Sequence, residues 1–255
     1  MAALEDTVPF LGSLRDVIML SATVSEFEQL TPRLQRIRFS GPRLRGLKWS
    51  AGQHIRVQVD GFAETLLRLA PHDSLRAYSI YDADPVRGTL DIVRFEHAAE
   101  PANITPSRRW IRDLQIGSTV RFTRPEGKLT SPPRAEYHVF AGEETASVAF
   151  AAMLRSLPMS AEVHGVVEAA TETDHLTLPR ELTRVERGDA SAADSPVLAA
   201  TLRDLPLPDR QGIAYLAGEA RTIQTLKRVL IDVHGWDRRN IRTKPFWTPG
   251  RTGME

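Results

Sequence analysis

Leu75-Arg76-Ala77-Tyr78-Ser79-Ile80 is the stretch from which the fold can be worked out. A polar loop precedes it and the turn-forming Asp82-Ala83-Asp84-Pro85 follows, so it predicts a short β-strand. Side chains alternate along a strand, which places Arg76 and Tyr78 on one face with Ser79 next to them. A guanidinium binds phosphate, a tyrosine stacks on a flat ring and a hydroxyl reaches a ring nitrogen. The set suits a flavin nucleotide, and an ordinary half-exposed strand is the alternative.

The segments around this strand have the same two-residue hydrophobic period. The pattern predicts further strands at 17–28, 35–39, 54–60, 65–69, 89–96 and 118–123, and a helix at 106–114. Glycine-containing turns separate most of them, for example Asp60-Gly61 and Arg87-Gly88. Many short strands with this patterning indicate an antiparallel β-barrel or a sandwich.

The rhythm changes after Pro125, where proline and glycine mark a boundary. Strands are expected at 137–141, 162–168, 175–178, 182–186 and 213–217, and helices at 145–157, 196–205 and 221–233. Alternating strands and helices predict a parallel sheet with helices on both faces. We therefore divide the chain into a β-barrel domain, residues 1–131, and an α/β domain, residues 132–255.

The second half contains a short internal repeat. Ala141-Gly142-Glu143 and Ala217-Gly218-Glu219 each end an expected strand just before a helix. Ligands of open parallel sheets bind at the carboxyl ends of strands, where helix N-termini offer free N–H groups. The two turns either frame one ligand cleft or are ordinary connections in which glycine serves the turn.

Composition excludes several functions. The 255 residues carry a formal net charge of +1, so bulk electrostatics indicate neither nucleic acid nor an anionic membrane as a partner. The chain has no cysteine, and its seven histidines lie far apart, which argues against disulfides and a protein-bound metal. No apolar run approaches the length of a membrane helix and no signal pattern opens the chain. We expect a cytoplasmic monomer that does not insert into a membrane.

Three motifs of common enzymes are missing from the sequence. There is no G-x-G-x-x-G dinucleotide fingerprint, no Walker A loop and no G-x-S-x-G elbow.

The helix expected after Pro106 begins with Ser107, Arg108 and Arg109, and a helix N-terminus with nearby cations is an anion site. The alternative is a solvated helix face on which the arginines pair with Asp113.

The order of several short motifs along the chain resembles a known family. These are Arg76-x-Tyr78-Ser79, a strand ending at His97, a helix with Trp110, the segment from Ala141 to Ala146, Ala217-Gly218-Glu219-Ala220, and Phe246-Trp247-x-x-Gly250. The series resembles the siderophore-interacting proteins, which are FAD-dependent ferric-siderophore reductases of the ferredoxin-reductase superfamily.

The resemblance implies a barrel that binds FAD and an α/β domain that receives NADPH or NADH. It implies that Arg76 holds flavin phosphate, Tyr78 stacks on the isoalloxazine and Ser79 bonds near its N5 edge. The remaining cofactor contacts it implies are His97, Ser107, Arg108, Trp110 and Thr145. It also implies a nicotinamide and substrate cleft lined by Glu219, Arg221, Lys244 and Trp247.

The implied activity is that of an oxidoreductase in iron transport. A nicotinamide cofactor would give a hydride to flavin, which would pass single electrons to chelated Fe(III) and release the iron. Such electron transfer needs no catalytic acid–base residue, and a ferric siderophore that is anionic favours cations near the cleft. The candidates are Arg56, Arg94, Arg242 and Lys244, each of which could be a plain surface charge. The alternatives are a flavin or quinone reductase and a non-catalytic module that binds a ferric chelate or a protein.

Overall fold

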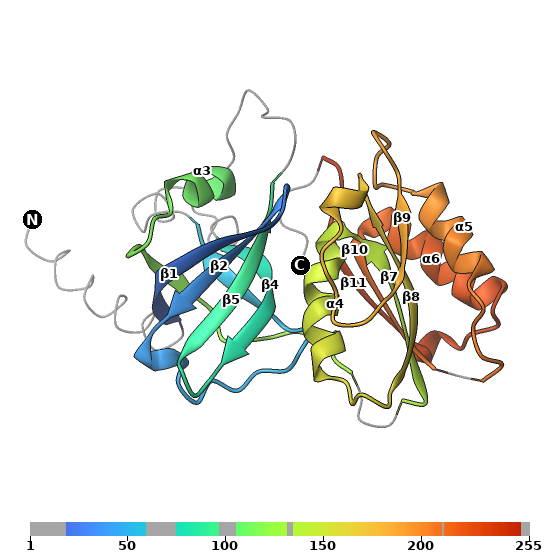
Figure 1. Ribbon diagram of the computed structural model, residues 1–255, viewed down its shortest axis with the longest axis horizontal. Coiled ribbons are helices and arrows are strands. Elements are labelled where there is room, and N and C mark those ends of the chain that lie inside the picture. Colours follow the sequence, from blue (N-terminus) through green and yellow to red (C-terminus); the bar gives the residue numbers. More distant parts are fainter. Residues whose placement is uncertain (1–18, 60–74, 97–105, 132–134, 211, 251–255) are drawn as a thin grey trace, which may run out of the picture.

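A computed structural model of the chain describes residues 19–59, 75–96, 106–131, 135–210 and 212–250. It contains two domains side by side, a barrel formed by the first half and an α/β domain formed by the second (Figure 1). The side chains of residues 106–108 lie outside the description. The strand expected at 65–69 lies outside the described residues as well.

The first domain is a closed antiparallel barrel, as expected. Its strands are β1 (Leu20–Thr31), β2 (Leu34–Ser40), β3 (His54–Gln58), β4 (Leu75–Asp84), β5 (Thr89–Phe95) and β6 (Thr119–Phe122), in the order β1-β2-β5-β4-β3-β6. Their alternating apolar residues fill the barrel, and Phe39 stacks on Phe122 with ring centroids 5.7 Å apart. The turn η1 (Pro42–Leu44) adds the fully buried Leu44 to this core.

The central strand of the argument, β4, is longer than expected. It runs through the predicted turn and ends at Asp84, because a shift in register between Ile80 and Asp82 lets the strand bend and continue. Helix α3 (Pro106–Asp113) packs Trp110 against the barrel core. The barrel therefore presents β4 with Trp110 beside it.

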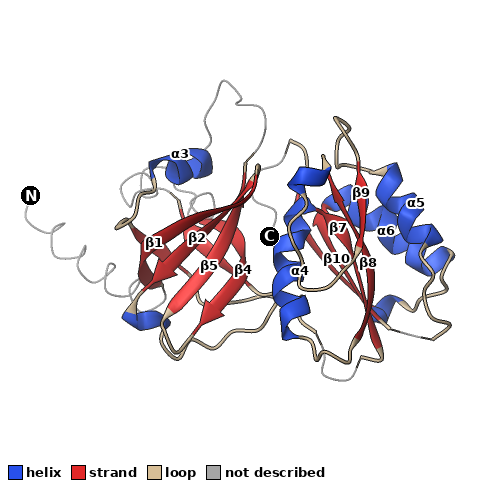
Figure 2. Cartoon of the chain, in the orientation of Figure 1, coloured by secondary structure: helices blue, strands red, loops and turns tan. Residues whose placement is uncertain are grey.

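The second domain is a five-stranded parallel sheet. Its strands are β7 (Tyr137–Glu143), β8 (Glu162–Ala169), β9 (Thr183–Glu186), β10 (Ile213–Glu219) and β11 (Ile241–Trp247), in the order β11-β10-β7-β8-β9. Helix α4 (Glu144–Ser156) covers one face, and α5 (Pro196–Asp204) and α6 (Ala220–Asp232) cover the other (Figure 2). The turns η3 (Glu172–Asp174) and η4 (Arg238–Asn240) complete the domain.

Two expectations about this domain were wrong. Residues 175–178 form no strand; Leu176 is buried because it packs against α4 and the barrel. The last segment, in turn, forms the edge strand β11, which the sequence reasoning did not predict. Pro245 lies within this strand, and proline is accepted in a strand at a sheet edge, where one side of the backbone has no strand to pair with.

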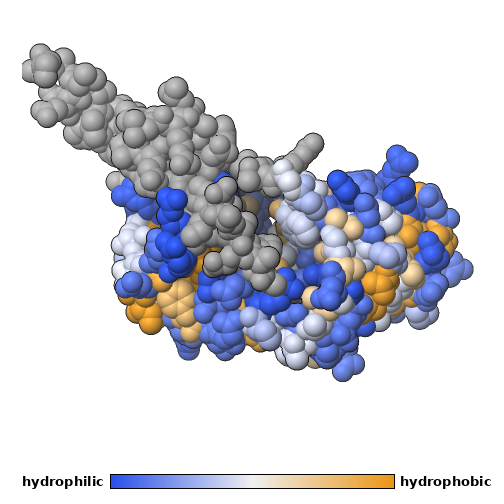
Figure 3. All heavy atoms as spheres, turned by 90° about the horizontal axis from the view of Figure 1, so that it is seen from above, coloured by the Kyte–Doolittle hydropathy of each residue, from blue (hydrophilic) through white to orange (hydrophobic). Residues whose placement is uncertain are grey.

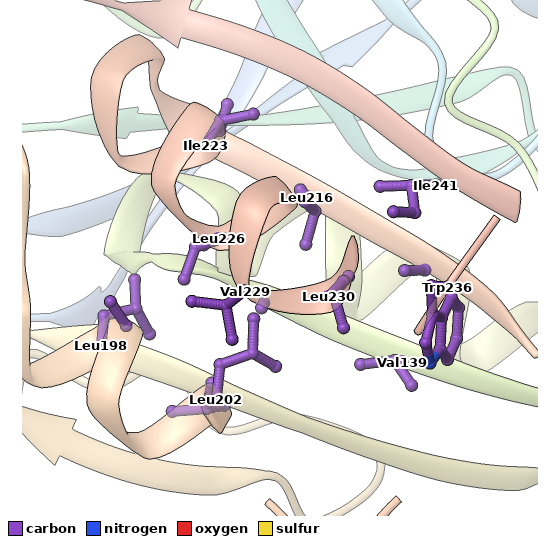
Figure 4. Close-up of a cluster of buried hydrophobic side chains, with 14 of the residues drawn as sticks. Val139, Leu198, Leu202, Leu216, Ile223, Leu226, Val229, Leu230, Trp236 and Ile241 are labelled. Carbon is purple, nitrogen blue, oxygen red and sulfur yellow. The ribbon is translucent and has the colours of Figure 1, made fainter. Parts of the chain in front are cut away.

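The core on the far face of the sheet fixes the positions of α5 and α6. Leu198 and Leu202 of α5 lie against Leu226 and Val229 of α6, above the sheet (Figure 4). Pro196 occupies the first turn of α5, and the side chain of Ser195 accepts a hydrogen bond from Leu198 N at 3.2 Å. This core holds the strand ends in place at the site described below.

Helix α4 joins the two domains. In Figure 1 it lies between the sheet and the barrel, and the packing agrees. Phe150 and Met153 pack on the sheet side, whereas Val148 and Ala151 pack against the barrel residues Leu34 and Val93. At the other end of the helix, the guanidinium of Arg155 stacks 4.4 Å from the ring of Tyr81.

The surface seen from above is mostly hydrophilic, with hydrophobic residues in small separate patches (Figure 3). Among the helices that the structure describes, we find none that combines the length and the apolar character needed to cross a bilayer.

Candidate functional site

A pocket of about 390 Å³ lies between the two domains. The barrel and the α/β domain each supply one wall, and the pocket is lined by Leu34, His54, Ala77, Tyr78, Ser79, Val93, Phe95, Thr145, Val148, Lys244, Pro245, Phe246, Trp247 and Thr248. Its volume falls within the range of small-molecule and cofactor sites.

The barrel wall is built on β4 and its neighbours. Antiparallel pairing places His54 of β3 directly opposite Ser79, so both side chains reach the pocket. The ring of Tyr78 lies 6.0 Å from the ring of Trp110, which backs it. Burial raises the pKa of the Tyr78 phenol, and the nearby guanidinium of Arg76 lowers it by a smaller amount. The phenol is therefore neutral at physiological pH and keeps its proton for donation.

The opposite wall consists of the start of α4 and the end of β11. Strand β11 runs parallel to β10 with Lys244 opposite Ala217 and Trp247 opposite Glu219, so its last residues arrive beside the start of α4. Thr145 in the first turn of α4 lines the pocket together with Trp247. An aromatic side chain from each domain therefore borders the same space.

Glu143 fixes the position of this second wall. Its carboxylate accepts hydrogen bonds from Thr145 N at 2.7 Å, from the Thr145 hydroxyl and from Trp247 Nε1 at 2.9 Å. The adjacent Gly218, at φ +119°, lacks the Cβ that would come within 2.6 Å of Glu143 Oε1. Burial and, to a smaller extent, the charge of Glu144 raise the pKa of Glu143 to about 7.

Glu219 has the same role one strand away. It is fully buried and caps α6, accepting hydrogen bonds from Arg221 N at 2.8 Å and Thr222 N at 2.9 Å. Its second oxygen accepts from the hydroxyl of Thr248 at 2.9 Å. The two Ala-Gly-Glu repeats therefore hold the consecutive residues Trp247 and Thr248 at the pocket.

A second, cationic cavity of about 670 Å³ shares His54 and Lys244 with the first. Its lining residues are His54, Arg56, Glu126, Gly127, Lys128, Leu129, Arg242, Thr243 and Lys244. Arg56 Nε bonds Glu126 at 2.5 Å, and Arg242 donates to the backbone oxygen of Thr130. Four cations face one carboxylate among these lining residues, so the cavity suits an anion.

The structure brings together part of the residue set predicted from the sequence. Tyr78, Ser79, Thr145, Lys244 and Trp247 line the pocket, and Arg76 and Trp110 lie beside Tyr78. Of the four candidate cations, Arg56, Arg242 and Lys244 line the second cavity; Arg94, which is not among its lining residues, bonds Gln35 at 2.8 Å. His97 and the side chains of Ser107 and Arg108 lie outside the described residues.

Two predicted cleft residues do not line either cavity. Glu219 is buried because its carboxylate is used to cap α6. Arg221 lies in the first turn of that helix with 63% of its side chain exposed, 3.8 Å from Asp194. Glu219 lies opposite Trp247 because β10 and β11 are neighbours, but its carboxylate and the Arg221 side chain contact other partners.

Several residues of the site were not predicted to be there. His54 reaches the pocket through the register of β3 on β4, and Lys128 reaches the second cavity from the segment that joins the domains. Glu143 was noted only as part of a repeat. Glutamate is not one of the usual N-cap residues, so the sequence carried no capping signal for its hydrogen bonds to Thr145.

The donor set fits a flavin. The pocket has an aromatic ring on each side, small hydroxyl side chains at Ser79 and Thr145, and Arg76 next to Tyr78 for a phosphate. In the described part of the chain, no group of three or more histidine or acidic side chains is placed to hold a metal ion.

A closed antiparallel barrel, a following parallel α/β domain and a pocket between them define the two-domain ferredoxin-reductase fold. The solved ferredoxin-NADP+ reductase of Plasmodium falciparum has this fold, with a TM-score of 0.68 and 13% identity over 89% of this chain and 96% of that one. Within this class, the chain belongs to the siderophore-interacting protein family. Residues 23–129 match the siderophore-interacting FAD-binding domain and residues 135–250 match the siderophore-interacting protein domain.

Two relatives resemble the chain over nearly its whole length. Ferric vibriobactin reductase ViuB of Vibrio cholerae is 25% identical over 241 residues, which cover 87% of this chain and 86% of that protein. The crystal structure of a siderophore utilization protein from T. fusca aligns with a TM-score of 0.76 and 22% identity, covering 93% of this chain and 95% of that one.

Proposed function

We propose that the protein is a flavin-dependent ferric-siderophore reductase that takes electrons from NADPH or NADH and releases iron as Fe(II). The observation that carries the proposal is the pair of adjoining cavities, one walled by Tyr78 and Trp247 and the other cationic, which share His54 and Lys244. The family membership and the similarity to a ferric vibriobactin reductase support it.

In this proposal the first cavity holds the flavin ring of FAD. Bound FAD supplies the conversion of a two-electron donation into two one-electron steps. Tyr78 would offer the ring a flat neutral surface, Ser79 and Thr145 would offer it hydroxyl groups, and Arg76 would bind phosphate. The apolar Leu34, Val93 and Phe246 exclude water from the same space.

The second cavity receives the ferric chelate. Arg56, Lys128, Arg242 and Lys244 attract an anionic complex, and the shared residue Lys244 places it beside the flavin. One NAD(P)H and two Fe(III) chelates give one NAD(P)+, one proton and two Fe(II), so charge and electrons balance. Fe(II) binds hard oxygen ligands less tightly than Fe(III), which releases the metal without an acid–base residue.

The test begins with the purified protein and FAD. We expect a yellow complex that NADPH or dithionite bleaches and that a ferric tris-catecholate reoxidises. Replacement Tyr78→Ala should weaken FAD binding about tenfold, whereas the control Tyr78→Phe keeps the ring and should bind as the wild type does. Flavin fluorescence quenching measures both affinities.

The outcomes separate the candidate functions. A colourless protein that ignores added FAD but binds the ferric complex would favour a non-catalytic module. A protein that reduces quinones and leaves the ferric complex unchanged would favour a general flavin reductase. A slower reoxidation by the anionic tris-catecholate in Lys244→Ala, with no change for a neutral ferric trihydroxamate, supports the assignment of the cationic cavity.

A further inference from the structure

The carboxyl edge of the α/β sheet bears a row of three buried glutamates. Glu219, Glu143 and Glu168 lie at the ends of the adjacent strands β10, β7 and β8, and each is at most 1% exposed. Glu143 and Glu168 are direct partners in the strand register. In open parallel sheets this edge is where the phosphates of a nucleotide bind, because helix N-termini meet there.

The chain's own side chains already use the helix N-termini at this edge. Thr145 N of α4 donates to Glu143, and the amides of Arg221 and Thr222 in the first turn of α6 donate to Glu219. In α5, Leu198 N donates to Ser195, whose hydroxyl in turn donates to Glu168. A diphosphate placed here would have to displace a side chain from each of these amides.

The charge of the edge also opposes a diphosphate. Glu144 lies next to Glu143, so four buried carboxylates gather in this region. Arg187 pairs with Glu144 at 2.5 Å and reaches Glu168 at 3.5 Å, and Arg33 of the barrel lies 3.7 Å from Glu144. Both guanidinium groups are therefore engaged with carboxylates, so neither is left to bind a phosphate.

We propose that Glu143 and Glu219 are specificity-determining residues that close this edge to the diphosphate of a dinucleotide, so that the hydride donor is held by its nicotinamide end alone. The inference rests on the proposed reductase function and narrows its donor. A dihydronicotinamide gives a hydride and becomes the nicotinamide cation, whether or not a diphosphate and adenosine are attached. Trp247 and Thr248, which the two glutamates hold at the pocket, supply the wall that such a donor meets.

The first test measures binding of redox-inert NADP+ to the full chain by calorimetry at pH 8 and low salt. We expect a wild-type dissociation constant on the order of 1 mM or weaker. Glu219→Gln should bind about tenfold more tightly, because one buried anion is removed from the phosphate position. A glutamine at 219 can still accept from both amides of α6 and donate to Thr248, so this variant keeps its cap.

The matched control makes the same charge change at the opposite edge of the sheet. Glu162 opens β8 and is 41% exposed, and Glu162→Gln should leave the affinity for NADP+ unchanged. Glu143→Gln should tighten binding as Glu219→Gln does. Micromolar binding by the wild type, or variants that bind no more tightly than the wild type, would overturn the proposal.

The second test uses the wild type alone and does not depend on the variants folding. The rate of flavin bleaching by NADPH is compared with that by reduced nicotinamide mononucleotide, which lacks the diphosphate bridge and adenosine. We expect values of kcat/KM within about threefold of each other, because the diphosphate contributes no binding energy. A larger preference for the dinucleotide would contradict the inference. Reoxidation of the dithionite-reduced protein by the ferric complex tests the proposed function separately.

Discussion

At the scale of single residues, the ionisation of Glu143 makes the stability of the fold depend on pH, and the same carboxylate holds Thr145 and Trp247 at the pocket. Its pKa is raised to about 7, chiefly because burial disfavours the charged form and secondly because Glu144 is close. The hydrogen bonds from Thr145 and Trp247 act in the opposite direction. In the unfolded chain a glutamate ionises near its ordinary value of about 4.3. Between these two values the folded protein binds a proton that the unfolded chain does not.

The consequence is a loss of stability as the pH rises. Stability decreases with pH wherever the folded state binds more protons, so the contribution of Glu143 is complete below about pH 4 and is lost as the pH rises through about 7. Urea unfolding at pH 5 and pH 8 should show that Glu143→Gln reduces this decrease by on the order of 2 kcal/mol. Equal slopes for the wild type and the variant between the two pH values would contradict the assignment.

Sequence reasoning identified pocket residues in two ways. Tyr78 and Ser79 have a chemistry that is visible within a few neighbouring positions, Thr145 was implied by the family resemblance, and the structure places all three in one pocket. His54 reaches the pocket only because β3 pairs with β4 in a particular register. A single sequence contains no direct signal for such a long-range register, so this residue could not be selected in advance.

At the scale of elements, the barrel depends on charged side chains across β2 and β5. Asp91 of β5 is 2% exposed and lies opposite Arg38 of β2 in the strand register. Its carboxylate accepts from Arg38 Nε and from Arg38 Nη2, both at 2.8 Å, and from Arg36 Nη1 at 3.3 Å. A two-pronged pair of this kind is stronger than an exposed ion pair.

We therefore expect Asp91→Ala to destabilise the protein by about 3 kcal/mol, because the partly buried Arg38 loses its two-pronged partner and Arg36 loses the most buried of its carboxylates. The control is Glu28→Gln. Glu28 also pairs with Arg36, at 2.7 Å, but it is half exposed, and its loss should cost less than about 1 kcal/mol. Urea unfolding curves compare the two. A similar small effect for both variants would show that burial of Asp91 does not strengthen the pair.

Most elements could be predicted, and the exceptions have physical causes. Segments with a clear period, such as Gln35–Phe39 in β2 or Glu162–Glu168 in β8, appear where they were expected. Strand β11 was not predicted because Pro245 lies within it, and a proline in a segment normally argues against a strand. Residues 175–178 resemble a strand in sequence because they include the apolar Leu176, which packs on α4. Side-chain packing of a loop and strand pairing produce the same apolar pattern in a sequence.

At the scale of the whole molecule, the site exists because two domains meet on α4. The barrel and the sheet were each predictable from their periodicity, but their docking was not. The barrel side of α4 is formed by Val148 and Ala151, and an alanine that faces another domain has the same sequence signal as an alanine that faces water. The pocket includes residues from both sides of this contact, so its integrity depends on it.

The last prediction concerns this contact. Ala151 is fully buried between α4 and the barrel, and Ala151→Glu would place a carboxylate among Leu34, Val93 and Leu176. An unpaired charge is not tolerated there, so the domains should separate while each keeps its own core. We expect FAD affinity to fall at least about tenfold, one thermal transition to become two, and proteases to cut between residues 123 and 137.

Ala200→Glu on the partly exposed side of α5 is the matched control and should behave as the wild type. If Ala151→Glu keeps one transition and wild-type FAD affinity, the contact on α4 does not hold the pocket together.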